Sequence, residues 1–503
     1  MDGLGDALPP GWTLRAISEI AVINPCTDKR EIGDDLPVAF VPMPAVGAGD
    51  GRIDVSETRP FAEVKKGYTG FREGDVLFAK ITPCMENGKM AVVPAVENGY
   101  GFGSTEFHVL RPGTEVTSAY LYYFVSSQQI RADAERHMTG AVGQRRVPAQ
   151  YFKDCRIPLA PLGQQQRIVA EVEKQFSRLD EAVANLQRVK VNLERYKAAV
   201  LKAAVEGKLT QDWRKAHPDV EPASELLDRI LAERRAKWEE AELAKMNAKG
   251  KAPTNETWKS RYKTPKGPKA EAPSELPPGW TWSSVDQLAE VGTGATPKRS
   301  EARYFGGEIP WVTSGAANRP FVDSASEFVT DAALAETNLT VYPAGTLLIA
   351  MYGEGRTRGK CTELRIAAAT NQALAALLVD DEVQPYLKLF LGMQYEETRK
   401  ASAGGVQPNL NLSLIRAIRV PLPSAQEQAA IVSELGRQLS LIESADAQVN
   451  LNLDRAQRLR QSILAAAFSG RLLDDTSAQE VPPVEQPQID MVAAPATEYR
   501  TSP

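Results

Sequence analysis

An internal repeat constrains this chain more than any other feature of its sequence. Four landmarks recur in the same order: residues 8–13 at 276–281, 74–78 at 345–349, 120–124 at 386–390, and 156–159 at 419–422. The offsets are 268, 271, 266 and 263, and the last register continues without a gap to residues 207–209 and 470–472. Offsets that drift by a few residues are typical of insertions and deletions in loops. The period is far too long for a solenoid, so the repeat predicts a duplicated module rather than two unrelated domains that share turn motifs.

Each copy begins with a part of mixed strand and helix character, at about residues 8–155 and 276–418. Gly74–Ile81 and Gly345–Met351 are short apolar runs after turn residues, as expected for strands. Helix-like stretches follow at Tyr120–Met138 and Tyr386–Ala401. This alternation favours an α+β fold over a pure β-sandwich.

A long amphipathic helix follows each globular part. The apolar residues recur mostly at spacings of three and four: Ile168, Val172, Phe176, Leu179, Val183, Leu186, Leu193, Tyr196 and Val200 in the first copy, and Ile431, Leu435, Leu439, Ile442, Val449, Leu453, Ala456, Leu459 and Ile463 in the second. So narrow a stripe predicts a coiled-coil seam, and about 40 residues at ~1.5 Å each span roughly 60 Å. Because the helices are equivalent copies, the simplest partner of each is the other, although each can also pair with another subunit. The pattern alone does not set their direction.

Local signals mark where these helices begin and end. Ser424 and Glu427 have the spacing of a capping box, in which the serine oxygen and the glutamate each satisfy a free backbone N–H. Gly207 and Gly470 stand where a left-handed glycine would end each helix.

The segment from Thr210 to Glu275 has no counterpart of similar length after the second helix. Ser224–Lys249 predicts a further amphipathic helix, and Gly250–Pro273 is rich in Lys, Pro and Thr and is expected to be extended or loose. Arg234–Lys269 holds eleven bases against four acids, which fits either a solvated linker or a contact with phosphate or a partner.

The net charge of −5 is uneven along the chain. Residues 473–503 carry six acids and one base, so residues 1–472 sum to about zero. This acidic tail is also rich in Pro, Gln and Ala, and its composition predicts disorder. Local charge is therefore the relevant quantity for a nucleic-acid partner.

The usual catalytic motifs are missing from the sequence. Gly353–Lys360 has the wrong spacing for a phosphate-binding loop, and no G-x-G-x-x-G follows a strand. Asn24-Pro25-Cys26 does not supply the Asn/Asp-Pro-Pro-aromatic loop of amino-methyltransferases. Four scattered cysteines and three histidines offer no zinc-site spacing. No apolar run reaches membrane-spanning length and Met1–Pro10 lacks the layout of a signal peptide, so we expect a cytoplasmic binding protein.

The order of motifs resembles the specificity subunits of type I restriction-modification enzymes over about residues 8–472. The resemblance rests on Leu-Pro-x-Gly-Trp openings at Leu8 and Leu276, on the loops Gly140–Gln144 and Ala403–Gln407, on the proline steps at Pro158 and Pro421, and on the helix entries at Gln164-Gln165 and Glu427-Gln428. The Glu-Gln entry is intact in the second copy and altered to Gln-Gln in the first.

The resemblance implies an architecture for the whole chain. Two tandem target recognition domains would each be followed by a long spacer helix, and the two helices would pair as an antiparallel coiled coil. The implied segments are a first recognition domain at 1–155, a spacer helix at 156–209, a linker at 210–275, a second recognition domain at 276–418, a second spacer helix at 419–472 and a tail at 473–503.

The resemblance also implies a function without catalysis in this chain. Each recognition domain would read one half of a gapped, two-part sequence in double-stranded DNA. The helices would hold the half-sites apart and dock two methylation subunits, which would use S-adenosylmethionine to methylate adenines. Restriction subunits would use ATP and Mg²⁺ to cleave the DNA. The cofactors would thus belong to the partners and none to this chain.

Residue chemistry selects the candidate DNA contacts. Arg and Lys suit guanine and phosphate, Asn and Gln suit adenine, and glycine-rich loops let the backbone approach DNA closely. The candidates are Lys80, Lys89, Gln144, Arg145 and Arg146 in the first domain and Arg356, Arg358, Lys360, Gln407 and Asn409 in the second. Trp12 and Trp280 are expected to anchor the core rather than to stack on bases.

Two other functions remain open at this point. A coiled-coil scaffold without DNA readout would have the same helices, and DNA binding in the presence of a methylation partner would distinguish it. A catalytic polypeptide fused to a specificity half would bind S-adenosylmethionine on its own.

Overall fold

The computed structural model describes residues 8–141, 143–250, 253, 255–268, 275–352, 357–395 and 410–473. Internal contacts divide the chain into two units, one made of residues 1–191 and 445–503 and the other of residues 192–444. Each unit thus joins one globular domain to a part of both long helices. Within the described residues, no helix is long and apolar enough to cross a membrane.

The first globular domain contains two four-stranded sheets. The larger has the strand order β2-β9-β6-β7, from Ala21–Ile23, Phe107–Pro112, Val76–Ala79 and Met90–Val92, and is antiparallel throughout. The smaller has the order β4-β3-β8-β5, from Thr58–Pro60, Pro37–Val41, Gly101–Gly103 and Thr69–Phe71. A separate pair, β1 (Thr13–Ala16) with β10 (Arg156–Leu159), joins the start of the domain to the segment before the long helix.

The second globular domain repeats this plan. The sheet β12-β20-β17-β18 takes the place of β2-β9-β6-β7 and is extended by β14; its strands are Ala289–Thr293, Leu374–Val379, Leu347–Ala350, Cys361–Leu364 and Phe321–Val322. A second sheet has the order β15-β13-β19-β16, from Glu327–Val329, Phe305–Val312, Ala368–Thr370 and Val341–Tyr342. The pair β11 (Thr281–Ser284) with β21 (Arg419–Leu422) matches β1 with β10. The α+β fold and the duplication are confirmed.

Several short helices surround the sheets. The first domain holds α1 (Ile17–Ile20), α2 (Phe61–Val64), α3 (Ser118–Ser126), α4 (Gln128–Arg136) and α5 (Ala149–Asp154). The second holds α9 (Val285–Leu288), α10 (Asp331–Glu336), α11 (Gln384–Met393) and α13 (Leu412–Arg416).

The helix expected at Tyr120–Met138 is in fact two helices. Ser127 ends α3 in an extended conformation with ψ 146°, and its side chain then accepts from the Ile130 N–H to begin α4. A serine that caps the next helix breaks the first one, because its hydroxyl competes for backbone donors. The matching stretch in the second domain is helical over α11, and residues 396–409 lie outside the described part of the chain.

The long helices are α6 (Leu162–Val205) and α14 (Ala425–Phe468), each of 44 residues. Both end as predicted at a left-handed glycine, Gly207 with φ +67° and Gly470 with φ +78°. The residue after each glycine donates its N–H five residues back, Lys208 to Ala203 and Arg471 to Ala466, which is the Schellman closure of a helix end.

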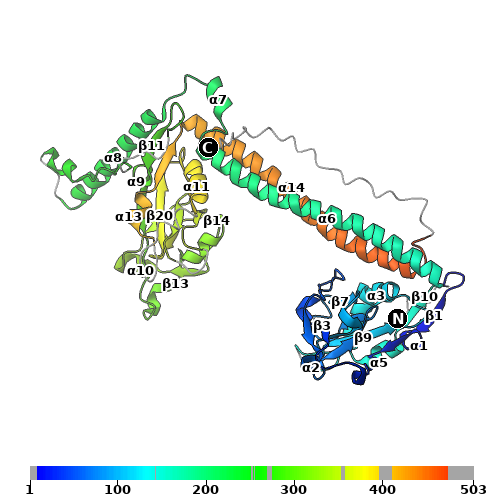
Figure 1. Cartoon of the computed structure of the whole chain (residues 1–503). Coiled ribbons are helices and arrows are strands. Elements are labelled where there is room, and N and C mark those ends of the chain that lie inside the picture. The colour runs from blue at the N-terminus through cyan, green and yellow to red at the C-terminus, as the bar shows by residue number, and fades with distance from the viewer. Residues whose placement is uncertain are drawn as a thin grey trace. The chain divides into compact units, whose positions relative to one another are not determined.

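The two helices pair antiparallel within each unit (Figure 1). In the first unit Asp180 contacts Arg460 at 2.7 Å and Lys190 contacts Asn450 at 2.8 Å, so the residue number rises on one helix as it falls on the other. In the second unit the Tyr196 hydroxyl donates to Gln438 at 3.2 Å. The seam is largely as predicted, but Leu459 is exposed and does not belong to it.

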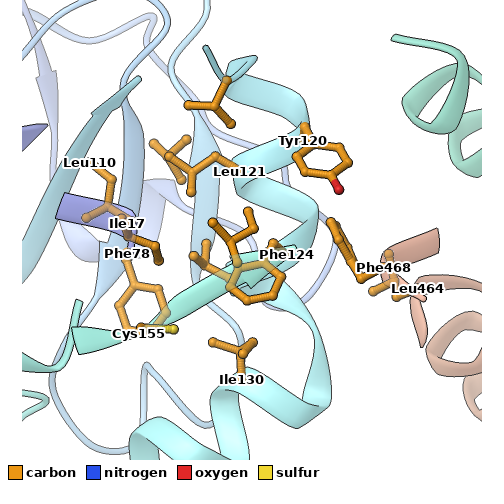
Figure 2. Packing of buried hydrophobic residues seen from close by; sticks show 14 of the residues in the cluster. Ile17, Phe78, Leu110, Tyr120, Leu121, Phe124, Ile130, Cys155, Leu464 and Phe468 are labelled. Atoms are coloured by element: carbon orange, nitrogen blue, oxygen red, sulfur yellow. The ribbon is translucent and has the colours of Figure 1, made fainter. Parts of the chain in front are cut away.

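Each globular domain packs against the start of its own helix and the end of the other helix. In the first unit Phe468 of α14 lies with its ring centroid 5.0 Å from Tyr120 and 5.2 Å from Phe124, in one core with Leu464 (Figure 2). In the second unit the last turns of α6 enter the core of the second domain in the same way through Ala204. Within each unit, the apolar seam of the helix pair is therefore continuous with the core of the globular domain.

The linker contains α7 (Gln211–Ala216) and α8 (Ala223–Ala248), so the helix predicted at Ser224–Lys249 is confirmed. The following stretch was expected to be extended or loose, and this is wrong for its described middle part. Glu256–Arg261 forms a 3-10 turn that folds back on α8, where Trp258 stacks on Trp238 with 5.9 Å between ring centroids. The buried indole supplies the apolar contact that the Lys- and Pro-rich composition concealed.

Candidate nucleic-acid interface

Three chain segments meet at the end of β6 in the first domain. The Lys80 N–H donates to the Glu106 carbonyl at 2.8 Å, and the Lys80 carbonyl accepts from the Val147 N–H at 2.9 Å. Thr139 and Arg146 exchange backbone hydrogen bonds at 3.0 and 2.8 Å. We call residues 139–147 the strap; residue 142 lies outside the described residues.

Gly140 explains why the strap carries the Gly-x-x-x-Gln pattern. Its φ is +119°, which favours glycine, and a Cβ atom there would lie 2.9 Å from the Gln144 carbonyl oxygen. The tight turn leaves Gln144 exposed at the surface, on the turn closed by the β-bridge between Thr139 and Arg146.

A buried histidine, His108, hydrogen-bonds to the last residue of the strap. His108 Nε2 lies 2.8 Å from the Val147 carbonyl oxygen and therefore carries the proton, while Nδ1 lies 3.0 Å from the Asn24 amide nitrogen and accepts from it. Burial, with a smaller contribution from Lys80, lowers the pKa of His108. The neutral imidazole thus links β9 to the strap.

A bidentate ion pair lies on the outer side of the same junction. Arg146 donates from Nη2 to Glu106 Oε1 at 2.7 Å and from Nε to Oε2 at 2.9 Å. Its Nη1 donates to the Gln144 carbonyl at 3.0 Å. The hydrogen bonds from Arg146, aided by its charge, lower the pKa of Glu106. Both side chains are partly exposed, Arg146 by 42% and Glu106 by 26%.

The other candidates of the first domain differ in their availability. Arg145 is partly exposed and lies 3.7 Å from the Glu135 carboxylate, and Lys80 is half-buried beside the strap. Lys89 is used internally, since its ammonium donates to the carbonyls of Met43 at 3.1 Å and Val46 at 2.7 Å. The structure thus brings Lys80, Gln144, Arg145 and Arg146 together and places Lys89 in a supporting role.

The second domain repeats the backbone junction. The Met351 N–H donates to the Ala373 carbonyl at 2.8 Å, and the Leu410 N–H donates to the Met351 carbonyl at 3.1 Å. Leu410 therefore takes the place of Val147, at the offset of 263 found in the helices. The predicted Gln407 and Asn409 then correspond to Gln144 and Arg146, but they lie with Arg356 outside the described residues.

The described candidates of the second domain follow β17. Lys360 donates from Nζ to Asn318 Oδ1 at 2.9 Å, and its carbonyl accepts from the Ala350 N–H at 3.0 Å. Asn318 also donates to Thr357 Oγ at 3.1 Å. Arg358 is half-buried next to Lys360 and engages another group. Asn318, which the sequence analysis did not select, orients this loop.

Trp12 and Trp280 are buried in the cores, as predicted. The Trp12 indole donates to Gln164 at 3.0 Å, and the Trp280 indole donates to Glu427 at 2.8 Å. The Leu-Pro-x-Gly-Trp opening of each copy is therefore tied to the first turn of its long helix.

The capping box predicted at Ser424 and Glu427 is only half right. The Glu427 N–H donates to Ser424 Oγ at 3.2 Å, as expected. The Glu427 carboxylate does not cap the helix; it accepts from Trp280, from Arg214 at 2.7 Å and from Thr210 at 2.6 Å. Three donors around a carboxylate that is 3% exposed outcompete one backbone N–H.

The residues around the strap supply hydrogen-bond donors and acceptors that suit base edges. Among the residues that the structure describes, no three His, Cys, Asp or Glu side chains lie close enough to hold a metal ion. The arrangement is a surface of amide, guanidinium, ammonium and carboxylate groups on a rigid backbone junction.

Comparison with protein families assigns the chain. The model of the type I restriction modification DNA specificity domain matches residues 9–194 and 277–450, and so covers both copies. The chain belongs to this family. The family match explains the two recognition domains and the two spacer helices described above.

Curated relatives and solved structures agree with this assignment. The chain is 28% identical over 484 residues to the EcoEI specificity subunit of Escherichia coli, covering 85% of this chain and 77% of the relative. It is 23% identical to the EcoKI specificity subunit of Escherichia coli K12, covering 92% and 90%. The HsdS subunit from Thermoanaerobacter tengcongensis has the same fold, with a TM-score of 0.60 at 20% identity over 94% of this chain and 100% of that chain.

Proposed function

We propose that this specificity subunit reads an asymmetric, two-part DNA sequence, one half through each recognition domain. The observation that carries the proposal is the repeated backbone junction with different side chains. In the first domain the junction is surrounded by Lys80, Glu106 and Arg146. In the second domain Met351 stands in place of Lys80 and Ala373 in place of Glu106. An identical frame with different polar groups suits two readers of different sequences.

The reading domains require partners for chemistry. We propose that this chain is not itself catalytic and acts in the cytoplasm with two methylation subunits, which bind S-adenosylmethionine and methylate adenines. Restriction subunits that use ATP and Mg²⁺ would cleave the DNA. The pairing of α6 with α14 supports a further part of the proposal, that the helices link the two readers, because linking two weak half-site contacts raises the effective concentration of the second one.

Single-molecule sequencing of modified bases tests the proposal directly. We expect a gapped adenine-methylation motif in the source genome that disappears when the gene is deleted. If the gene of the methylation subunit is not expressed in the source organism, co-expression of this chain with that subunit should produce a gapped methylation motif on a plasmid library. A co-expressed pair that binds together but methylates no gapped sequence would favour a coiled-coil scaffold instead.

A further inference from the structure

We propose that Glu106 is a specificity-determining residue of the first recognition domain and that Arg146 positions it. The proposal rests on the function proposed above and names a residue within that site. Glu106 would accept a hydrogen bond from the amino group of a base, either cytosine N4 or adenine N6.

The position of Glu106 is the first argument. Its carbonyl forms part of the junction that carries Lys80 and the strap, and Ala373 occupies the equivalent place in the second domain through the same 2.8 Å backbone hydrogen bond. Alanine has no side-chain group that can hydrogen-bond to a base edge. The backbone roles of Glu106 and Ala373 are the same, so the same backbone junction forms in the second domain without a carboxylate at this position.

The engagement of Arg146 is the second argument. Recognition of guanine by arginine needs two parallel donors on one edge of the guanidinium. Glu106 already takes the Nε and Nη2 edge, and the Gln144 carbonyl takes Nη1. The Nε and Nη2 edge of Arg146 is therefore not free to bind a guanine while Glu106 is in place.

The remaining capacity of the carboxylate is the third argument. An ionised carboxylate has about four lone-pair positions, and Arg146 uses only part of them. The guanidinium holds Glu106 in one orientation and keeps it ionised, while 26% of its side chain stays exposed. A fixed, partly exposed acceptor next to the strap matches the amino groups of cytosine and adenine, whereas the guanine O6 and thymine O4 acceptors would be repelled.

Methylation-motif mapping with the reconstituted complex tests this role. Glu106→Ala should relax one position of one half-site, with about a tenfold loss of preference for the amino-bearing base and no change in the other half-site. Glu106→Gln should keep an acceptor and retain more of that preference. Arg146→Ala should relax the same position as Glu106→Ala, because it releases the carboxylate from its orientation.

Two comparisons make the result decisive. Glu57→Gln is the matched control, since Glu57 forms an ion pair with Arg59 in the same domain but on the other sheet, and it should leave the motif unchanged. Thermal melting should show that each variant folds. An unchanged motif in Glu106→Ala overturns the inference, as does uniform weakening on all sequences when Arg146 is replaced, because that marks a phosphate contact. Absence of any gapped motif with the unmodified chain overturns the proposed function itself.

Discussion

Single side-chain hydrogen bonds join the beginning of each copy of the repeat to its long helix. The indole of the Leu-Pro-x-Gly-Trp opening finds a carbonyl-type oxygen in both copies, Gln164 in one and Glu427 in the other. The carboxylate of Glu427 also pairs with Arg214, which follows the end of α6, whereas Gln164 is a neutral amide.

This difference predicts unequal effects of matched substitutions. Glu427→Gln should destabilise the second unit by about 2 kcal/mol, because Arg214 keeps its charge in a mostly buried place without a counter-ion. Gln164→Glu should change the first unit little, since Gln164 is half-buried and its new charge can reach water. Urea unfolding of both variants measures the two effects. Equal losses would show that the arginine partner is not what distinguishes the two positions.

A pH dependence follows from His108 at the same scale. Its pKa is lowered in the folded state by burial, so the unfolded chain binds the proton more readily. This contribution to stability is complete above the unfolded pKa of about 6.5 and is lost as the pH falls below it.

Melting experiments between pH 5 and pH 7 would measure this contribution. The first unit should melt at lower temperature at pH 5 than at pH 7, and His108→Gln should reduce the difference because glutamine does not titrate. A His108→Gln variant with the full difference would assign the pH dependence to other groups.

At the scale of the elements, periodicity and spacing in the sequence predicted those features that depend on residues close together in the chain, such as helix ends and strand positions. The ends of α6 and α14 follow from Gly207 and Gly470, and the repeat register placed β6 and β17 correctly. Contacts between residues distant in sequence left no such signal. Nothing in the pattern around Glu427 indicates that its carboxylate contacts Arg214, and Glu106 is an isolated acid before a strand. Such contacts depend on which segments meet in space, whereas propensity and periodicity report only neighbours along the chain.

The helix pair leads to a prediction about the gap between the half-sites. Four residues inserted in both α6 and α14 lengthen each helix by about one turn, roughly 5.4 Å. We expect the preferred gap to change by one or two base pairs, at about 3.4 Å each. Motif mapping measures the gap, and an insertion in a single helix serves as the control because it disrupts the seam. An unchanged gap in an active double insertion would show that the helices do not set the spacing.

At the scale of the whole molecule, the two units are unequal in how they use the chain. The second unit is one continuous segment, residues 192–444, whereas the first combines residues 1–191 with residues 445–503. Phe468 and Leu464 supply part of the first domain's core although they are distant in sequence. The boundary of a stable unit therefore does not coincide with the boundary of a repeat.

A truncation tests this arrangement. A chain that ends after Ser444 keeps every residue of the first recognition domain but loses Phe468, whose burial alone is worth about 3–5 kcal/mol. We expect the first unit to become sensitive to protease while the second unit stays protected. Phe468→Ala in the full chain is the milder comparison and should lower the stability of the first unit only. A truncated chain whose first domain resists protease would show that this domain closes its core alone.

The shared core also determines the order in which the two units can fold during synthesis. A ribosome adds roughly 5–20 residues per second, so roughly 15–60 s separate the appearance of the first domain from that of Phe468. During this interval Tyr120 and Phe124 lack the aromatic ring that covers them in the finished protein. The second unit, all of whose residues have emerged by then, can fold first. The first unit is thus synthesised first but completes its core last. The apolar surface that it exposes in the meantime is a suitable binding site for a chaperone.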